Sequence, residues 1–298
     1  MPALSSDVFA RLPEPAALAQ LAKVAADSFG VPSANCVAAG PGVQILLPHV
    51  FSLIPPGRAI VLGPTYAEHA RVAALVGHDT READEIAALH EANLAIVVNP
   101  NNPDGRVVPR EALLELAGVL RRRDGLLVVD EAFMDVGPVK TTLAPDVALG
   151  SIVVLRSFGK FFGLAGLRLG FALAIPGTAE RLRSSLGPWA VSGPAIIAGT
   201  AALADRDWID TTRVRLATAA MRLDALLHEA RFTVIGGASL FQTVRSPDAI
   251  EVFHRLGSAG VLVRHFPDRP QLLRFGLPGL DADWDRLRAA LQYDKRST

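Results

Sequence analysis

Short, uninterrupted apolar runs recur along the middle of this 298-residue chain: AIVLG (59–63), LAIVVN (94–99), LLVVDEA (126–132) and SIVVLRS (151–157). Runs of this kind are typical of strands that are buried on both faces. Helical patterns such as REALLELAGVLRRR (110–123) lie between them, and the repeat of about 30 residues is the size of a βαβ unit. The pattern predicts an α/β fold, with a mostly parallel sheet between two layers of helices.

The expected sheet defines a large domain over residues 31–202. A long amphipathic pattern (207–230) follows, and then short strand and helix patterns alternate to the end of the chain. This order predicts a smaller α+β domain over residues 203–298. We expect residues 1–30, a shortened N-terminal segment, to pack with that smaller domain.

Charge and composition argue against several functional classes. Thirty basic residues balance thirty acidic ones, and no polybasic run indicates a nucleic-acid or membrane partner. The N-terminus lacks a secretory signal pattern, and no charge-free apolar run reaches membrane-spanning length. The single cysteine, Cys36, suits a reducing cytoplasm. We predict no metal site.

Only four of the thirty basic residues are lysines: Lys23, Lys140, Lys160 and Lys295. Arginine stays charged, so it cannot act as an amine nucleophile. Lys160 alone lies among glycines and aromatics, in RSFGKFFGLAGLRLGF (156–171).

Polar residues follow three of the expected strands. Asn102 lies in NPNNPDG, Asp130 ends the next strand, and Lys160 comes shortly after the third, at spacings of 28 and 30 residues. Because the carboxyl ends of parallel strands share one edge of a sheet, we expect the three to converge there. Taken singly, each residue also has a simpler explanation: Asn102 could belong to a tight turn, Asp130 could cap the next element, and Lys160 could be a surface lysine.

The motifs NPNNPDG, VVDEAF and RSFGKFFGLAGLRLGF resemble those of the fold type I pyridoxal-phosphate enzymes, the aminotransferase superfamily. Within it, the chain is similar to the histidinol-phosphate aminotransferase branch. The double Phe after Lys160, together with PTYAEH and RLPEP, resembles the threonine-phosphate decarboxylases of cobalamin biosynthesis. The resemblance extends over nearly the whole chain, and it implies pyridoxal 5'-phosphate as the cofactor.

The resemblance implies a role for each motif residue. Lys160 bonds covalently to the cofactor's aldehyde, and apolar surroundings favour the uncharged amine that this bond requires. Asp130 faces the pyridine nitrogen and keeps it protonated. Asn102 donates its amide to the ring's phenolic oxygen, and His69, in PTYAEH, stacks on the ring.

Four residues are implied at the cofactor phosphate: Ser157, Arg168, and the backbone amides of Gly42 and Val43. At the substrate, Arg274 corresponds to the arginine that clamps the carboxylate. Arg264 corresponds to one that binds a substrate phosphate in the histidinol-phosphate branch.

Three departures from the family pattern bear on the site. Phe133 stands where many relatives have a tyrosine that bonds the phenolic oxygen. Leu12 replaces a tyrosine that reaches across a dimer to the neighbour's cofactor phosphate. The family's N-terminal arm lies before Met1, so either the start codon is assigned late or the protein is shortened.

The resemblance implies a homodimer that acts on a phosphorylated amino acid. Cleavage of the Cα–carboxylate bond of threonine phosphate gives aminopropanol phosphate and carbon dioxide, whereas cleavage of Cα–H gives transamination. A non-catalytic ligand-binding module is the alternative from another functional class.

Overall fold

The computed structural model describes residues 4–292, which divide into two compact units. The first unit holds the residues up to Asn101 together with Val107–Trp208. The second holds Asn102–Arg106 and the residues from Ile209 onward. The N-terminal residues, expected to pack with the smaller domain, therefore belong to the larger unit.

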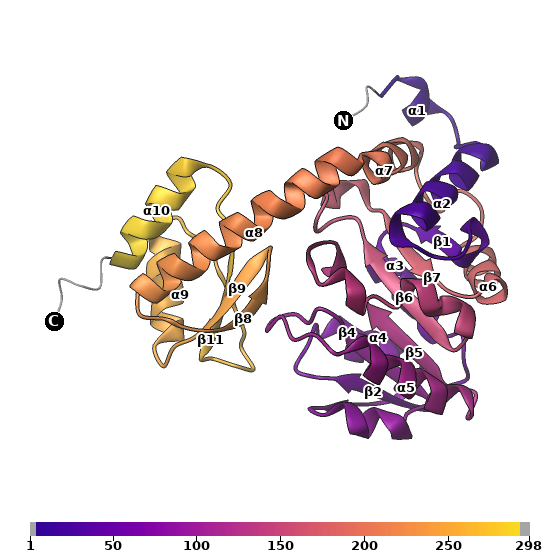
Figure 1. The fold of residues 1–298 in the computed structure, drawn as a ribbon, viewed down its shortest axis with the longest axis horizontal. Coiled ribbons are helices and arrows are strands. Elements are labelled where there is room, and N and C mark those ends of the chain that lie inside the picture. Colours follow the sequence, from indigo (N-terminus) through magenta and orange to yellow (C-terminus); the bar gives the residue numbers. More distant parts are fainter. Residues whose placement is uncertain (1–3, 293–298) are drawn as a thin grey trace. The chain divides into compact units, whose positions relative to one another are not determined.

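Seven strands of the first unit form one sheet, in the order β1-β7-β6-β5-β4-β2-β3 (Figure 1). Strands β6, β5, β4, β2 and β3 pair in parallel, and β7 is antiparallel to both of its neighbours. The strands are β1 (Val37–Gly40), β2 (Arg58–Leu62), β3 (Asp79–Ala83), β4 (Leu94–Val98), β5 (Leu126–Asp130), β6 (Ile152–Ser157) and β7 (Gly170–Leu173). The predicted mostly parallel α/β fold is confirmed.

Helices cover both faces of this sheet (Figure 1). They are α1 (Asp7–Ala10), α2 (Pro15–Phe29), α3 (Val43–Phe51), α4 (Glu68–Leu75), α5 (Arg110–Arg121), α6 (Pro176–Leu186) and α7 (Gly193–Ala204). Helices α3, α4 and α6 share a buried apolar cluster with one face, to which Ala172 contributes. Phe171 points to the other face, because side chains alternate along a strand. There it lies edge-on to Phe29 of α2, at 5.4 Å between ring centroids.

The strand sequences explain this layered arrangement. Every residue of β4 and of β5 is buried, as a strand covered on both faces requires. Helix α2 packs against α7, and so the N-terminal part of the chain completes the helical layer of the larger unit.

The second unit is an α+β fold, as predicted. Its antiparallel sheet has the order β10-β11-β9-β8. Its elements are α8 (Arg206–Glu229) from Ile209 onward, β8 (Thr233–Ala238), β9 (Phe241–Arg245), α9 (Ala249–Ser258), β10 (Arg264–His265), β11 (Leu272–Gly276) and α10 (Asp281–Gln292). Helices and strands enclose one apolar cluster that includes Leu227, Val244 and Trp284.

The short segment Asn102–Arg106 is built into this second unit. The Thr243 hydroxyl donates to the Pro103 carbonyl, at 2.5 Å. A Cβ added at Gly236 would lie 2.1 Å from the Asp104 carbonyl oxygen, so only glycine permits this approach of two backbones. Between residues 4 and 292, no helix has both the length and the apolar character needed to cross a membrane.

Candidate active site

Several of the predicted site residues lie at or just after the ends of strands in the first unit, at the carboxyl edge of the parallel strands. Asp130 ends β5, and the Asn99 amide, just past β4, donates to its carbonyl. Ser157 ends β6 opposite Gly170, and Gly40 at the end of β1 faces the same glycine from the other side. Asp130, Ser157 and Gly40 thus lie at one edge of the sheet, and the expected convergence of Asn102, Asp130 and Lys160 stays a prediction.

Asp130 is fixed by a hydrogen bond at each carboxylate oxygen. The Ala132 amide donates to Oδ1 at 3.0 Å, and Nε2 of His69 lies 2.9 Å from Oδ2. His69 is fully buried, and its Nδ1 has no hydrogen-bond partner among the residues that the structure describes. The bond places a proton on Nε2 of His69, because a carboxylate can only accept.

The ring of His69 lies near two aromatic side chains, edge-on to Tyr66 and tilted relative to Phe51. Its centroid lies 5.7 Å from that of Tyr66, at 85° between the planes, and 6.3 Å from that of Phe51. The stacking role implied for His69 stays a prediction. What the structure adds is a direct bond from His69 to the carboxylate that is expected to face the cofactor nitrogen.

A cradle formed by Gly42, Val43 and Arg168 lies where β1 leads into α3. Gly42 caps α3 with a φ of 92°, and the first amides of a helix have no partner within it. A Cβ added at Gly42 would lie 2.8 Å from Nη2 of Arg168, and one at Gly170 would lie 2.6 Å from the Val43 nitrogen. Both glycines therefore keep the helix start open next to a guanidinium, which suits a phosphate dianion.

Lys160 follows β6 in a turn that its own carbonyl closes by accepting from the Gly163 amide, at 3.1 Å. Its Nζ lies 5.8 Å from the centroid of the Phe133 ring. The side chain is exposed in the single chain, although the sequence predicts apolar surroundings. The flanking aromatics supply these only in part: Phe158 stacks on Phe162 at 4.4 Å, and Phe162 on Trp208 at 5.9 Å.

Three polar side chains that the sequence reasoning missed shape the loops after β2 and β4. The Thr65 hydroxyl donates to Oδ1 of Asn101 at 2.6 Å, and Nδ2 of Asn101 donates to the Pro64 carbonyl at 2.9 Å. Asn99 exchanges two hydrogen bonds with the backbone of Val108. NPNNPDG is therefore more than a turn, because its asparagines fix the loop that leads into Asn102.

In the second unit, Asn102 and the two predicted arginines form a compact group. Arg264 and Arg274 are register partners on β10 and β11, and Nη1 of Arg274 donates to Oδ1 of Asn102. Burial lowers the pKa of Arg274 from its ordinary value, and the positive charge of Arg264 adds to this effect. Two cations brought together in this way favour an anionic ligand.

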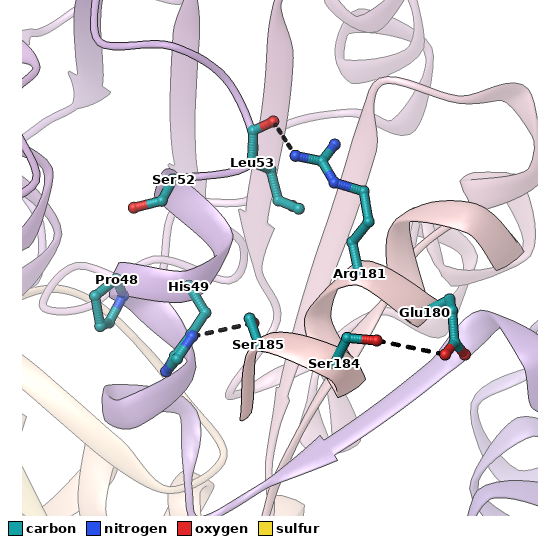
Figure 2. Close-up of a pocket in the computed structure, with 8 residues that line it drawn as sticks. All are labelled: Pro48, His49, Ser52, Leu53, Glu180, Arg181, Ser184 and Ser185. Atoms are coloured by element: carbon teal, nitrogen blue, oxygen red, sulfur yellow. Dashed lines mark hydrogen bonds between the residues drawn. The ribbon is translucent and has the colours of Figure 1, made fainter. Parts of the chain in front are cut away.

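A surface groove of about 700 Å³ lies elsewhere on the first unit, between α3 and α6 (Figure 2). Nδ1 of His49 is 3.1 Å from the Ser185 hydroxyl, and Arg181 donates to the Leu53 carbonyl at 3.0 Å (Figure 2). None of the predicted site residues lines this groove, whose walls are Pro48, His49, Ser52, Leu53, Glu180, Arg181, Ser184 and Ser185.

The sequence reasoning also missed a buried ionic cluster that lies next to the ends of β5 and β6. Arg156 donates to Glu131 at 3.1 Å and to Asp135 at 2.5 Å. Burial raises the pKa of Glu131 above its ordinary value, although Arg156 opposes this shift. The two carboxyl groups outnumber the one guanidinium, and so the cluster carries an excess negative charge when both are ionised.

The raised pKa of Glu131 makes stability depend on pH. Above 4.5, the reference pKa of a glutamate, the folded chain keeps a proton that the unfolded chain has released. The stability this proton gives is complete below that pH and is lost as pH rises through the folded pKa. We expect the wild type to lose stability relative to Glu131→Gln over that window, measured by urea unfolding at a series of pH values. Equal pH slopes in the two proteins would contradict this.

The similarity of this chain to known proteins extends over nearly its whole length. Residues 3–291 match the model of the family "Aminotransferase class I and II". The threonine-phosphate decarboxylase of Pseudomonas aeruginosa is 39% identical over 98% of this chain and 87% of its own. Histidinol-phosphate aminotransferase 1 of Methylococcus capsulatus is 32% identical over 86% of this chain and 76% of its own.

A solved structure agrees with these sequence matches. The histidinol-phosphate aminotransferase of Sinorhizobium meliloti, in complex with pyridoxal-5'-phosphate, superposes with a TM-score of 0.84 at 26% identity. The match covers 98% of this chain and 84% of that one. The sequence matches, the superposed fold and the polar residues at the carboxyl edge of the sheet, here called the rim, all indicate the same family. The chain belongs to the aminotransferase class I and II family.

Proposed function

We propose that this protein is a pyridoxal-phosphate-dependent decarboxylase. It converts L-threonine O-3-phosphate to (R)-1-aminopropan-2-yl phosphate and carbon dioxide, a step of cobalamin biosynthesis. The observation that carries this choice is the 39% identity with a threonine-phosphate decarboxylase over 98% of the chain.

The residues at the rim fit the cofactor at both of its ends. The cradle offers the Val43 amide and the Arg168 guanidinium to a phosphate, whereas the Gly42 amide donates to the Gly40 carbonyl at 2.8 Å. Ser157 lies at the adjoining strand end. Asp130, held by Ala132 and His69, presents a carboxylate suited to a protonated ring nitrogen. When bound there, pyridoxal phosphate supplies an electron sink for the pair released as a bond to Cα breaks.

The chain's own groups then have distinct tasks. Lys160 would hold the cofactor by its aldehyde carbon, and its amine, once free, would be available to move a proton. Asp130 keeps the proton on the ring nitrogen. Asn102, whose Oδ1 is taken by Arg274, has its Nδ2 to donate to the phenolic oxygen.

The arginines of the second unit orient the substrate. Arg274 binds the carboxylate, and Arg264, its neighbour across β10 and β11, binds the substrate phosphate. Both groups of threonine phosphate are anionic, and a pair of guanidiniums binds two such groups in fixed geometry. This orientation decides which bond to Cα lies perpendicular to the ring and breaks.

Transamination is the second candidate, because histidinol-phosphate aminotransferases are also similar to most of this chain. The two reactions are separated by supplying threonine phosphate without any keto acid. We expect carbon dioxide and aminopropanol phosphate in equal amounts, measured by gas release and mass spectrometry. Turnover that occurs only with 2-oxoglutarate would overturn the decarboxylase assignment and support the aminotransferase.

We further propose a homodimer located in the cytoplasm. Exposed apolar side chains support a partner surface: Phe9 is 69% exposed, Leu12 62% and Trp189 56%. Phe9 lies on α1, which contacts α7, and Trp189 lies in the segment that leads into α7. The free, buried thiol of Cys36 suits a reducing compartment.

A further inference from the structure

One buried guanidinium bridges the two ends of the turn that follows β5. Nη1 of Arg156 donates to Oε2 of Glu131 at 3.1 Å, and Nη2 donates to Oδ1 of Asp135 at 2.5 Å. The guanidinium also lies over the ring of Phe29, 4.6 Å from its centroid. All three charged side chains are at most 7% exposed, so solvent screens these bonds very little.

The turn that Arg156 bridges carries Phe133 between its two anchored ends. The ring of Phe133 is the group that lies 5.8 Å from Nζ of Lys160. Glu131 is fixed further by the Thr142 hydroxyl at 2.5 Å and by the Leu143 amide at 2.7 Å. The position of the Phe133 ring therefore depends on a carboxylate that Arg156, the Thr142 hydroxyl and the Leu143 amide hold in place.

The same guanidinium also joins the ends of two adjacent strands. Glu131 directly follows Asp130 at the end of β5, and Arg156 directly precedes Ser157 at the end of β6. The Arg156–Glu131 bond thus spans the two strand ends that present the expected nitrogen partner and one of the expected phosphate ligands. A shift of this bond would move both groups.

Stability alone gives little reason for such a cluster. Removing charges from water is costly, and replacing a buried ion network by apolar side chains is often neutral or stabilising. Here two carboxylates share one guanidinium, and burial raises the pKa of Glu131. The network fixes the positions of Glu131 and Asp135 relative to Arg156, because the guanidinium is planar and its N–H groups point in fixed directions.

We propose that Arg156 is a positioning residue, which acts through Glu131 and Asp135 to hold Asp130, Ser157 and the Phe133 ring in the geometry that receives the cofactor. This inference rests on the proposed cofactor site, and it adds to that site a residue that does not touch the cofactor.

The test compares Arg156→Lys with Arg110→Lys. Arg110 makes a similar two-bond contact with Asp146, at 3.0 and 2.5 Å, away from the strand ends. A lysine keeps the charge but cannot bridge two carboxylates in fixed geometry. Three quantities are measured: the unfolding midpoint of cofactor-free protein, the Kd for pyridoxal phosphate by absorbance, and the pH midpoint of the bound cofactor's absorption band.

We expect both variants to fold with lowered unfolding midpoints. Only Arg156→Lys should weaken cofactor binding, by about tenfold, as expected for displaced binding groups, and only it should shift the pH midpoint of the band. If Arg156→Lys does not fold, Glu131→Gln, which keeps the shape but loses the charge, takes its place with the same expected shifts.

Three results would count against the proposal. Equal Kd values and pH midpoints in the Arg156 and Arg110 variants would overturn it and leave the proposed function standing. So would a wild-type Kd and pH midpoint in Glu131→Gln, where that variant is used. A wild-type protein that develops no absorption band with pyridoxal phosphate would overturn the proposed function, and this inference with it.

Discussion

Replacing Lys160 with alanine is expected to abolish covalent cofactor attachment and to lower the decarboxylation rate by a factor on the order of 10⁴ or more. The amine is the nucleophile that bonds the cofactor's aldehyde, and no other side chain at the rim can do so. Because Lys160 is exposed and outside the core, the variant should unfold at the wild-type temperature. Borohydride reduction followed by peptide mass spectrometry checks attachment directly.

The matched control for this variant is Lys140→Ala. Lys140 is also exposed, lies in a surface turn of the same unit, and has no expected role. It should keep full activity and the same trapped peptide, which contains Lys160. A coloured Lys160→Ala protein whose cofactor is trapped on another lysine would show that the assignment of the attachment site is wrong.

Replacing Asp130 with asparagine is expected to lower the rate by about 10³-fold, the scale of losing one preorganised electrostatic group. An asparagine has nearly the same shape, and its amide oxygen can still accept from the Ala132 amide. Its Nδ2 then faces Nε2 of His69, which can accept if the ring carries its proton on Nδ1 instead, so the local fold should survive. It has no negative charge to keep a proton on the ring nitrogen. The measurement is kcat with threonine phosphate, together with the Kd for the cofactor.

The phosphate cradle is distant in sequence from Asp130 and does not depend on its charge. Cofactor affinity in Asp130→Asn should therefore fall much less than kcat. Asp146→Asn, at a carboxylate bonded to Arg110, serves as the control with unchanged kcat. An unchanged kcat in Asp130→Asn would mean that this carboxylate does not face the ring nitrogen.

The fold and the rim of the site were accessible from the sequence because they depend on local patterns. Continuous apolar runs identify strands covered on both faces, and polar residues at their carboxyl ends meet at one edge of a sheet. Gly42 and Val43 were implied by the resemblance, and they lie at the start of α3. The roles of the individual site residues came from resemblance, and they remain predictions.

What the sequence could not provide depends on contacts between distant residues. The bond from His69 to Asp130 joins positions 61 residues apart, and PTYAEH shows only that a histidine is present. In the sequence, Arg156 is only a polar residue near the end of an apolar run. Its contacts with Glu131 and Asp135 are visible only in the folded chain. The N-terminal helices joined the larger unit because α2 buries its apolar face against α7, a choice that periodicity alone does not determine.

Segment Asn102–Arg106 limits how this chain can be divided and recombined. It is encoded in the middle of the larger unit, yet its Pro103 carbonyl is bound by Thr243, 140 residues later. A fragment that starts at Ile209 would therefore lack part of its own fold, and a nascent chain cannot complete this segment's contacts until β9 has been synthesised. A chimaera that exchanges the second unit between relatives must carry residues 102–106 with it, and Asn102 is then inherited together with Arg274 rather than with Lys160.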